Sequence, residues 1–181
     1  MAKKLPKLYI HGCYIGTTGF NNHTRDFFRD LSHTYDLKVR NFTVPKYWEK
    51  LTDEPFNKEP YLLPLDKKLL NRQTMFDKNR RLTDAAIYSK HENIVNHDIN
   101  IVLAEVNHHF FYQQYEGPKI AYTVWETTEY PSAFFETLKT YDQIWVPSKW
   151  QKECNIKQGI PEDRIKIIPE AVDSKTFYPD S

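Results

Sequence analysis

Residues 119–169 decide the fold: KIAYTVWETTEYPSAFFETLKTYDQIWVPSKWQKECNIKQGIPEDRIKIIP. Short runs rich in β-branched and aromatic residues alternate here with longer runs that have helical spacing. The predicted strands are residues 119–124, 143–146 and 164–168, and the predicted helices are residues 132–141 and a helix that opens after Pro147. Strands that alternate with helices in this way predict βαβ units with a parallel sheet.

The helix after Pro147 has a marked beginning and end. Ser148 followed three residues later by Gln151 is a capping-box pattern. Gly159 suits the residue that follows the last helical turn, and Pro161 prevents the helix from continuing. We therefore expect a helix between Ser148 and Gly159, which connects the predicted strand at residues 143–146 to the one at residues 164–168.

The amino-terminal part repeats the alternation. A strand at residues 7–10 leads into the loop YIGTTG (14–19), a helix follows, and a second strand lies at residues 37–42. The residues that recur at helical spacing on one face of this helix are Phe20, Thr24, Phe27, Phe28 and Leu31. Residues 99–106 (INIVLAEV) are largely apolar, as expected for a strand that is covered on both faces.

These elements predict an α/β fold with an open, twisted, mostly parallel Rossmann-like sheet and helices on both faces. The length of 181 residues suits a single domain spanning residues 1–181. Residues 44–81 are expected to form an irregular excursion, Pro-rich at first and then basic. Its last part, residues 66–81, is predicted to be helical and carries six basic and two acidic residues.

The composition argues against several classes of protein. The 25 Lys and Arg residues nearly balance 24 Asp and Glu, and a net charge of +1 disfavours a nucleic-acid binder. No apolar run is long enough to span a membrane, and the amino terminus lacks a signal-peptide pattern. The two cysteines, Cys13 and Cys154, match no zinc motif and are expected to be reduced thiols. We therefore expect a cytoplasmic protein.

The residues that follow the predicted strands are candidates for a ligand site, because ligands of open parallel sheets bind beyond the carboxyl ends of the strands. Gly16 and Gly19 would let a ligand approach the backbone, although their spacing is not that of a dinucleotide or P-loop motif and a structural turn is the alternative. Of the adjacent pair His108 and His109, one is expected to be partly buried and one solvated. Glu126 could bind sugar hydroxyls beside the Trp125 indole, or it could form a rim salt bridge beside a packed Trp.

The carboxyl-terminal segment contains W-E…P before a helix, the junction D-x-I-W-V-P-S-x-W, and the run G-I-P…I-x-x-I-P-x-x-V-D…F-x-P. With these motifs it resembles family 4 of the retaining GT-B glycosyltransferases. The segment GTTGFNNHTRDFFRDLS (16–32) is similar to the glycine loop and first helix of that family. The match covers residues 119–181 and 12–32.

This resemblance implies the amino-terminal, acceptor-side half of a two-domain GT-B enzyme, with the carboxyl-terminal donor domain absent from the chain. It implies a hexosyltransferase-like reaction in which a sugar moves, with retention, from a nucleotide-sugar co-substrate to a hydroxyl of a sugar or glycan acceptor. No cofactor and no metal are expected in this domain. The donor domain would act in cis or in trans, and the chain alone would be inactive.

The resemblance also implies roles for particular residues. The residues implied for the donor-phosphate loop are Gly16, Thr17, Thr18 and Gly19. Many relatives place a His after the strand matched here by residues 119–124, whereas this chain has Trp125 and Glu126, so Glu126 becomes the candidate catalytic residue. The residues expected on the acceptor side are Asn107, His108, Trp125, Ser148 and Lys149, with Ser148 chiefly a helix cap.

Other functions stay open at this point. One is a free-standing carbohydrate-binding or scaffold subunit without catalysis. Another is a generic nucleotide-binding module, which the missing G-x-G-x-x-G motif disfavours. The basic helix could make a weak peripheral contact with an anionic membrane or bind a phosphorylated acceptor, and a solvated helix face is its alternative. The residues that would make the membrane contact are Lys67, Lys68, Arg80 and Arg81.

Overall fold

A computed structural model of the chain describes residues 5–12, 23–24, 27, 31–41, 99–106, 109 and 117–170. These residues form a six-stranded parallel sheet with the strand order β2-β1-β3-β4-β5-β6. The predicted α/β, Rossmann-like fold is confirmed. The predicted excursion at residues 44–81, with its basic helix and the four residues of the membrane contact, lies outside the described residues.

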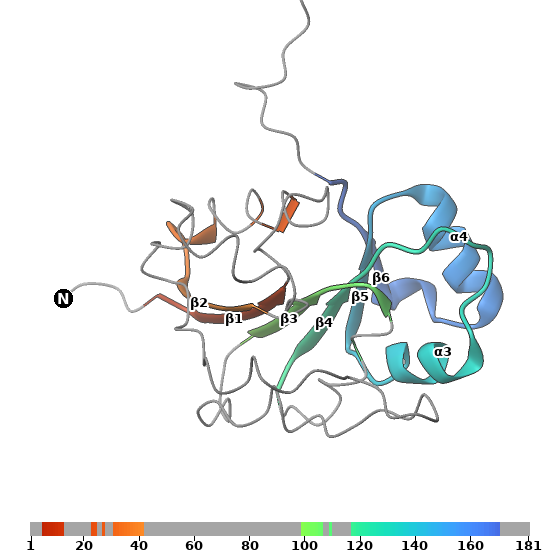
Figure 1. Cartoon of the computed structure of the whole chain (residues 1–181), viewed down its shortest axis with the longest axis horizontal. Coiled ribbons are helices and arrows are strands. Elements are labelled where there is room, and N and C mark those ends of the chain that lie inside the picture. Colours follow the sequence, from red (N-terminus) through yellow and green to blue (C-terminus); the bar gives the residue numbers. More distant parts are fainter. Residues whose placement is uncertain are drawn as a thin grey trace, which may run out of the picture.

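Every strand predicted from the sequence is present. The strands are β1 (Lys7–Gly12), β2 (Asp36–Asn41), β3 (Ile99–Leu103), β4 (Lys119–Tyr122), β5 (Gln143–Val146) and β6 (Ile165–Ile167). The named helices are α3 (Ser132–Leu138), α4 (Lys149–Gln158) and the short 3-10 helix η5 (Glu162–Arg164). Figure 1 shows α3 and α4 beside the half of the sheet that contains β5 and β6.

Both faces of the sheet are apolar, because the strands carry consecutive apolar residues and successive side chains of a strand point to opposite sides. On β3, Ile101 and Leu103 belong to one buried cluster and Val102 belongs to the other. The first cluster packs against Phe27 and Leu31, which lie at helical positions between β1 and β2. The second packs against apolar side chains of α3 and α4. Helices therefore cover both faces, as the sequence predicted.

Three elements end at least two residues earlier than the sequence predicted. β4 stops at Tyr122 rather than residue 124, and β3 stops at the paired residue Leu103 rather than residue 106. α3 stops at Leu138 rather than residue 141, and the chain turns directly after it. The carbonyl of Thr137 accepts hydrogen bonds from both the N–H and the hydroxyl of Thr140, at 3.0 and 2.7 Å, so the turn itself satisfies an acceptor at the helix end.

α4 begins and ends where the sequence predicted. Ser148 is its N-cap, and the hydroxyl oxygen accepts a hydrogen bond from the backbone N–H of Gln151 at 3.2 Å. Gly159 is the C-cap with a φ of 112°, and its N–H bonds to the carbonyls of Asn155 and Ile156 at 3.1 and 3.0 Å. A positive φ of this size strains any residue that has a Cβ, so the glycine is required by the backbone.

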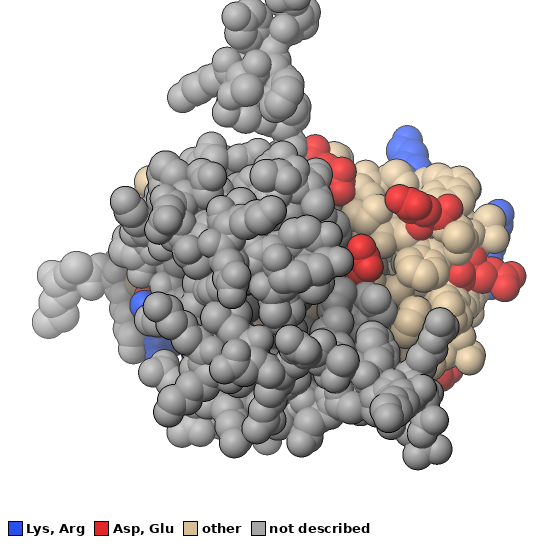
Figure 2. Space-filling model, in the orientation of Figure 1, with Lys and Arg blue, Asp and Glu red and all other residues tan. Residues whose placement is uncertain are grey.

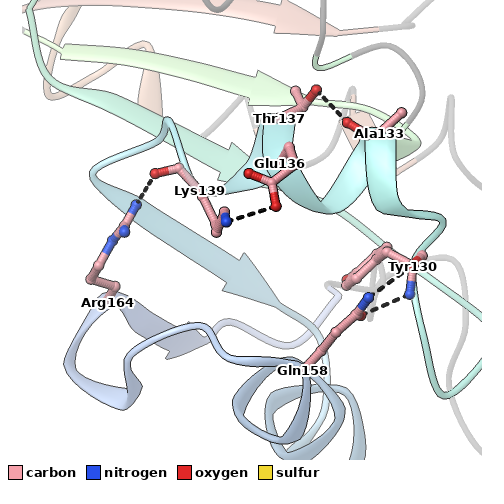
Figure 3. Close-up of polar contacts among 7 residues, drawn as sticks. All are labelled: Tyr130, Ala133, Glu136, Thr137, Lys139, Gln158 and Arg164. Carbon is pink, nitrogen blue, oxygen red and sulfur yellow. Dashed lines mark hydrogen bonds and ion pairs between the residues drawn. The ribbon is translucent and has the colours of Figure 1, made fainter.

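Arg164 ties the turn before β6 to the end of α3 (Figure 3). Its guanidinium donates hydrogen bonds to the carbonyl of Lys139 at 2.9 Å and to the carbonyl of Tyr141. Lys139 also forms an ion pair with Glu136 at 2.7 Å, but both side chains are exposed and such a pair adds little stability. The contact that fixes the end of α3 is therefore the one made by Arg164.

Replacing Gly159 with Ala should lower the free energy of unfolding by about 1–2 kcal/mol, because the added Cβ is strained at positive φ. A steric clash does not contribute, because the nearest atom to that Cβ is a Phe135 ring carbon at 3.8 Å, an ordinary van der Waals distance. Urea denaturation measures the change. Lys157→Ala, at an exposed position on the same turn, is the control and should stay within about 0.5 kcal/mol. A Gly159→Ala variant as stable as the wild type would contradict the prediction.

Candidate functional site

The strand order reverses between β1 and β3. The chain runs from β1 outward to β2 in one direction, and from β3 through β4 and β5 to β6 in the other. Gly12 and Leu103 are paired at the carboxyl ends of β1 and β3. In open parallel sheets such a switch point is where ligands bind. The predicted site residues that lie outside the described residues are Gly16, Thr17, Thr18, Gly19, Asn107 and His108.

The other four predicted site residues lie just beyond the carboxyl ends of two adjacent strands. Trp125 and Glu126 follow β4, and Ser148 and Lys149 follow β5. Glu126 and Lys149 are exposed, whereas Trp125 and Ser148 are half-buried. The fold thus brings one carboxylate, one ammonium, one hydroxyl and one indole to the same edge of the sheet, as the sequence predicted.

Trp125 is held by contacts within the protein. Its ring stacks on Tyr130, with centroids 5.3 Å apart and an interplanar angle of 30°, and Phe134 meets it edge-on at 6.3 Å. Its Nε1–H donates to the carbonyl of Glu129 at 2.9 Å. Because Tyr130 covers one face of the indole, a sugar ring could stack only on the opposite face.

Amide side chains of α4 fix the loop between β4 and α3. Gln158 pairs with the backbone of Tyr130: the Tyr130 N–H donates to Oε1, and Nε2–H donates to the Tyr130 carbonyl, both at 2.8 Å (Figure 3). The Tyr130 hydroxyl accepts hydrogen bonds from Gln151 Nε2 at 3.0 Å and from Asn155 Nδ2 at 3.2 Å. We call Tyr130, Gln151, Asn155 and Gln158 the amide cluster.

Gln151 makes only one of the two contacts of the predicted capping box. Its backbone N–H bonds to Ser148, as predicted, but its side chain turns inward. There Nε2–H donates to the carbonyl of Thr123 at 3.2 Å as well as to Tyr130. Only 2% of Gln151 is exposed, and a buried amide without hydrogen bonds is unfavourable, so its hydrogen-bond partners lie inside the protein. The side chain thereby links the end of β4 to the start of α4.

The sequence analysis did not identify the amide cluster. The signal that could have revealed it is the spacing of Gln151, Asn155 and Gln158, which places three amides on one face of a helix. A helix that packs on a sheet normally carries apolar side chains on that face. Three amides there predict a buried polar partner, because buried polar groups are almost always hydrogen-bonded.

His109 supports the fold just after β3. It is fully buried, whereas the sequence predicted one partly buried and one solvated His in this pair, and His108 lies outside the described residues. Its Nε2 donates to the carbonyl of Ala104 at 3.0 Å, and the hydroxyl of Tyr141 donates to the His109 carbonyl at 2.8 Å. Through its ring and its backbone carbonyl, His109 therefore connects the end of β3 to the segment that follows α3.

Charges and metal-binding side chains form no further site in the part of the chain that the structure describes. No group of three or more His, Cys, Asp and Glu residues that could hold a metal occurs there, and the absence of a metal elsewhere stays a prediction. No described helix is long and apolar enough to cross a membrane. Figure 2 shows separate acidic and basic side chains over α3 and α4. Cys154 is a buried free thiol, as expected.

These features define a doubly wound α/β domain whose candidate site lies at the carboxyl edge of the sheet. A solved structure with a similar fold is the apo form of a lipopolysaccharide outer core galactosyltransferase, WaaB, with a TM-score of 0.59 and 15% sequence identity. The similarity covers 95% of this chain and 47% of that chain, so this chain spans about half of its length. At this identity the likeness shows the fold alone.

No protein-family model matches the chain, and no curated protein sequence matches it. The resemblance to family 4 therefore stays a prediction.

The protein should lose stability at alkaline pH because of Tyr122 and Tyr130. Burial raises the pKa of both hydroxyls above the ordinary value of 10.0, and the Glu170 carboxylate raises the pKa of Tyr122 further. For Tyr130 the hydrogen bonds from Gln151 and Asn155 partly oppose this rise. A raised pKa means that the folded state holds the proton more tightly than the unfolded state. The stabilisation is therefore complete below the unfolded pKa and is lost above it.

Urea denaturation at pH values from about 8 to about 11 checks this prediction. The free energy of unfolding should fall above about pH 10, and it should fall less steeply in Tyr130→Phe, which has one shifted hydroxyl fewer. Tyr130→Phe is also expected to be less stable at neutral pH, so the slopes are compared rather than the absolute values. Equal slopes in the two proteins would show that Tyr130 titrates alike in the folded and unfolded states.

Proposed function

We propose that this chain is the acceptor-binding domain of a glycosyltransferase, which moves a sugar from a nucleotide-sugar donor to a hydroxyl of a sugar or glycan acceptor with retention. The observation that carries the proposal is the exposed Glu126 carboxylate, held on a fixed loop at the carboxyl edge of a parallel sheet, in a fold similar to about half of a galactosyltransferase. A second, donor-binding domain would supply most of the nucleotide-sugar site, in cis or in trans. The chain alone would be inactive, and a cytoplasmic location remains part of this proposal.

The chemistry assigns different tasks to the two predicted halves of the site. Transfer with retention passes through an oxocarbenium-like state while negative charge builds on the leaving diphosphate, and preorganised donors must meet that charge. In this proposal the N–H groups of the loop at residues 16–19, with the hydroxyls of Thr17 and Thr18, serve as those donors. Glu126 accepts a hydrogen bond from the acceptor hydroxyl, which orients it for attack.

The remaining residues at the edge would bind the acceptor. The Ser148 hydroxyl oxygen already accepts a hydrogen bond from Gln151, which leaves its O–H for a ligand oxygen. The exposed ammonium of Lys149 is a further donor. The face of Trp125 opposite Tyr130 would pack against the C–H face of a sugar ring, and Asn107 and His108 would complete the acceptor side. A hydroxyl-rich acceptor suits this combination of donors, carboxylate and indole.

A transfer assay tests the proposal directly. The native protein, captured with an antibody to this chain, is incubated with nucleotide sugars and a panel of glycan acceptors, and NMR determines the anomeric configuration of any product. A product with the configuration of the donor supports the proposal. An inverted product would exclude retention, and saccharide binding without any transfer would indicate a carbohydrate-binding subunit instead.

Glu126→Gln should reduce the transfer rate or the acceptor affinity by about 10- to 100-fold, which is the usual effect of losing a hydrogen bond to a charged group. Glu136→Gln on α3 is the matched control, because this exposed carboxylate forms only a surface ion pair with Lys139. Circular dichroism establishes that both variants fold. Unchanged kinetics in Glu126→Gln would leave Glu126 as a rim residue without a role in the reaction.

A further inference from the structure

We propose that Gln158 is a positioning residue: by pairing with the backbone of Tyr130 it fixes the loop of residues 125–129, and so presents Glu126 to the acceptor in one orientation. The part of this inference that concerns the acceptor rests on the proposed function. The part that concerns the position of the loop does not, and the two are tested separately below.

The geometry of the pairing determines both the place and the direction of the loop. Gln158 is the last residue of α4, and it bonds to a residue 28 positions away in the chain. A side-chain amide offers one acceptor and two donors, so it can match the N–H and the carbonyl of a single residue. Both hydrogen bonds measure 2.8 Å. Two bonds to one residue fix its backbone against sliding and against rotation.

The position of Tyr130 is passed on to Glu126 through contacts within the loop. The Tyr130 ring stacks on Trp125, whose Nε1–H donates to the Glu129 carbonyl at 2.9 Å. The hydroxyl of Thr127 donates to the same carbonyl, also at 2.9 Å. Glu126 thus lies in a short segment that is tied at both of its ends. A shift of the Tyr130 backbone would move Trp125, and the Glu126 carboxylate would move with it.

The chemistry of the amide cluster favours positioning over simple stabilisation. Gln151 is 2% exposed and Asn155 is fully buried, so both amides lose contact with water, and the partner that they share is the Tyr130 hydroxyl. Apolar side chains would attach the helix to the sheet without that desolvation. Directional hydrogen bonds instead select one arrangement of the groups that they join. Here Gln151 Nε2, Asn155 Nδ2 and both polar atoms of the Gln158 amide are all engaged, while Asn155 Oδ1 has no partner among the described residues. The group selected here is the loop that carries the candidate catalytic carboxylate.

The loop position can be followed by 19F NMR of the full 181-residue chain labelled with 5-fluorotryptophan. The chain has four Trp residues, and the Trp125→Phe variant assigns the signal of Trp125. Gln158→Met keeps the length of the side chain and removes both hydrogen bonds. We expect the Trp125 signal to shift or to split in Gln158→Met. An unchanged Trp125 signal in the folded variant would overturn the proposal.

The chain supplies a matched control for the same substitution. Gln143, on β5, accepts a hydrogen bond from Nε1–H of Trp145 at 3.1 Å and takes no part in the loop. Gln143→Met should therefore move the signal of Trp145 and leave that of Trp125 in place. If Gln158→Met does not fold, Gln158→Glu decides, because it keeps the acceptor for the Tyr130 N–H and loses the donor. A wild-type Trp125 signal in Gln158→Glu would overturn the proposal.

Saccharide binding tests the consequence for the acceptor. Gln158→Met should weaken binding about three- to tenfold, and the same change in a Glu126→Gln background should have a smaller effect, because only the contact of Trp125 with the sugar is then left to lose. A residue that only stabilises the fold would give equal effects in both backgrounds. If the wild type binds no saccharide but the Trp125 signal moves, the proposed function fails and the positioning of the loop stands. If the Trp125 signal moves and affinity is unchanged, positioning for the acceptor is overturned.

Discussion

The pairing of β1 with β3 is the constraint on which the rest of the structure depends. The chain leaves these two neighbouring strands toward opposite edges of the sheet: β1 leads to β2 at one edge, and β3 leads to β4 in the direction of the other edge. Right-handed crossovers then place the following segments on opposite faces of the sheet. Ile10 and Ile101, paired in register, sit in the cluster on one face, while Val102 belongs to the cluster on the other. The same divergence opens the carboxyl edge of the sheet to a ligand.

α4 serves two purposes with different side chains. Ile156 packs against the apolar cluster, and Ile160 just beyond the helix is buried in it, so together they hold the helix on the sheet. The amides of Gln151 and Gln158 instead reach the loop after β4. Apolar contact is strong but not directional, whereas a hydrogen bond specifies an orientation. This difference explains why α4, which packs on the sheet, also carries a row of amide side chains on its inward face.

The features that could be predicted from the sequence are those that depend on residues close together in the chain. The alternation of strands and helices gave the α/β fold, and Ser148 and Gly159 marked the ends of α4 because capping depends on neighbouring residues. Topology alone then placed Glu126 at the carboxyl edge. The identity of partners brought together by folding was not predictable: the amide spacing on α4 indicates a buried polar partner, but that this partner is Tyr130, which also stacks on Trp125, follows only once α4 lies on the loop. The glycine loop at residues 16–19 stays a prediction.

The pairing of β1 with β3 also has a consequence for biosynthesis. Ile10 and Ile101 are partners although 101 − 10 = 91 positions separate them in the chain. At about 5–20 residues per second, a ribosome needs roughly 5–20 s to make that interval. During this time β1 can pair with β2, its partner on the other side, but its second edge has no strand to meet. An unpaired edge can join another nascent chain. β1 therefore waits longer for β3 than any other strand of the sheet waits for its neighbour, and chaperones have their longest opportunity at this edge.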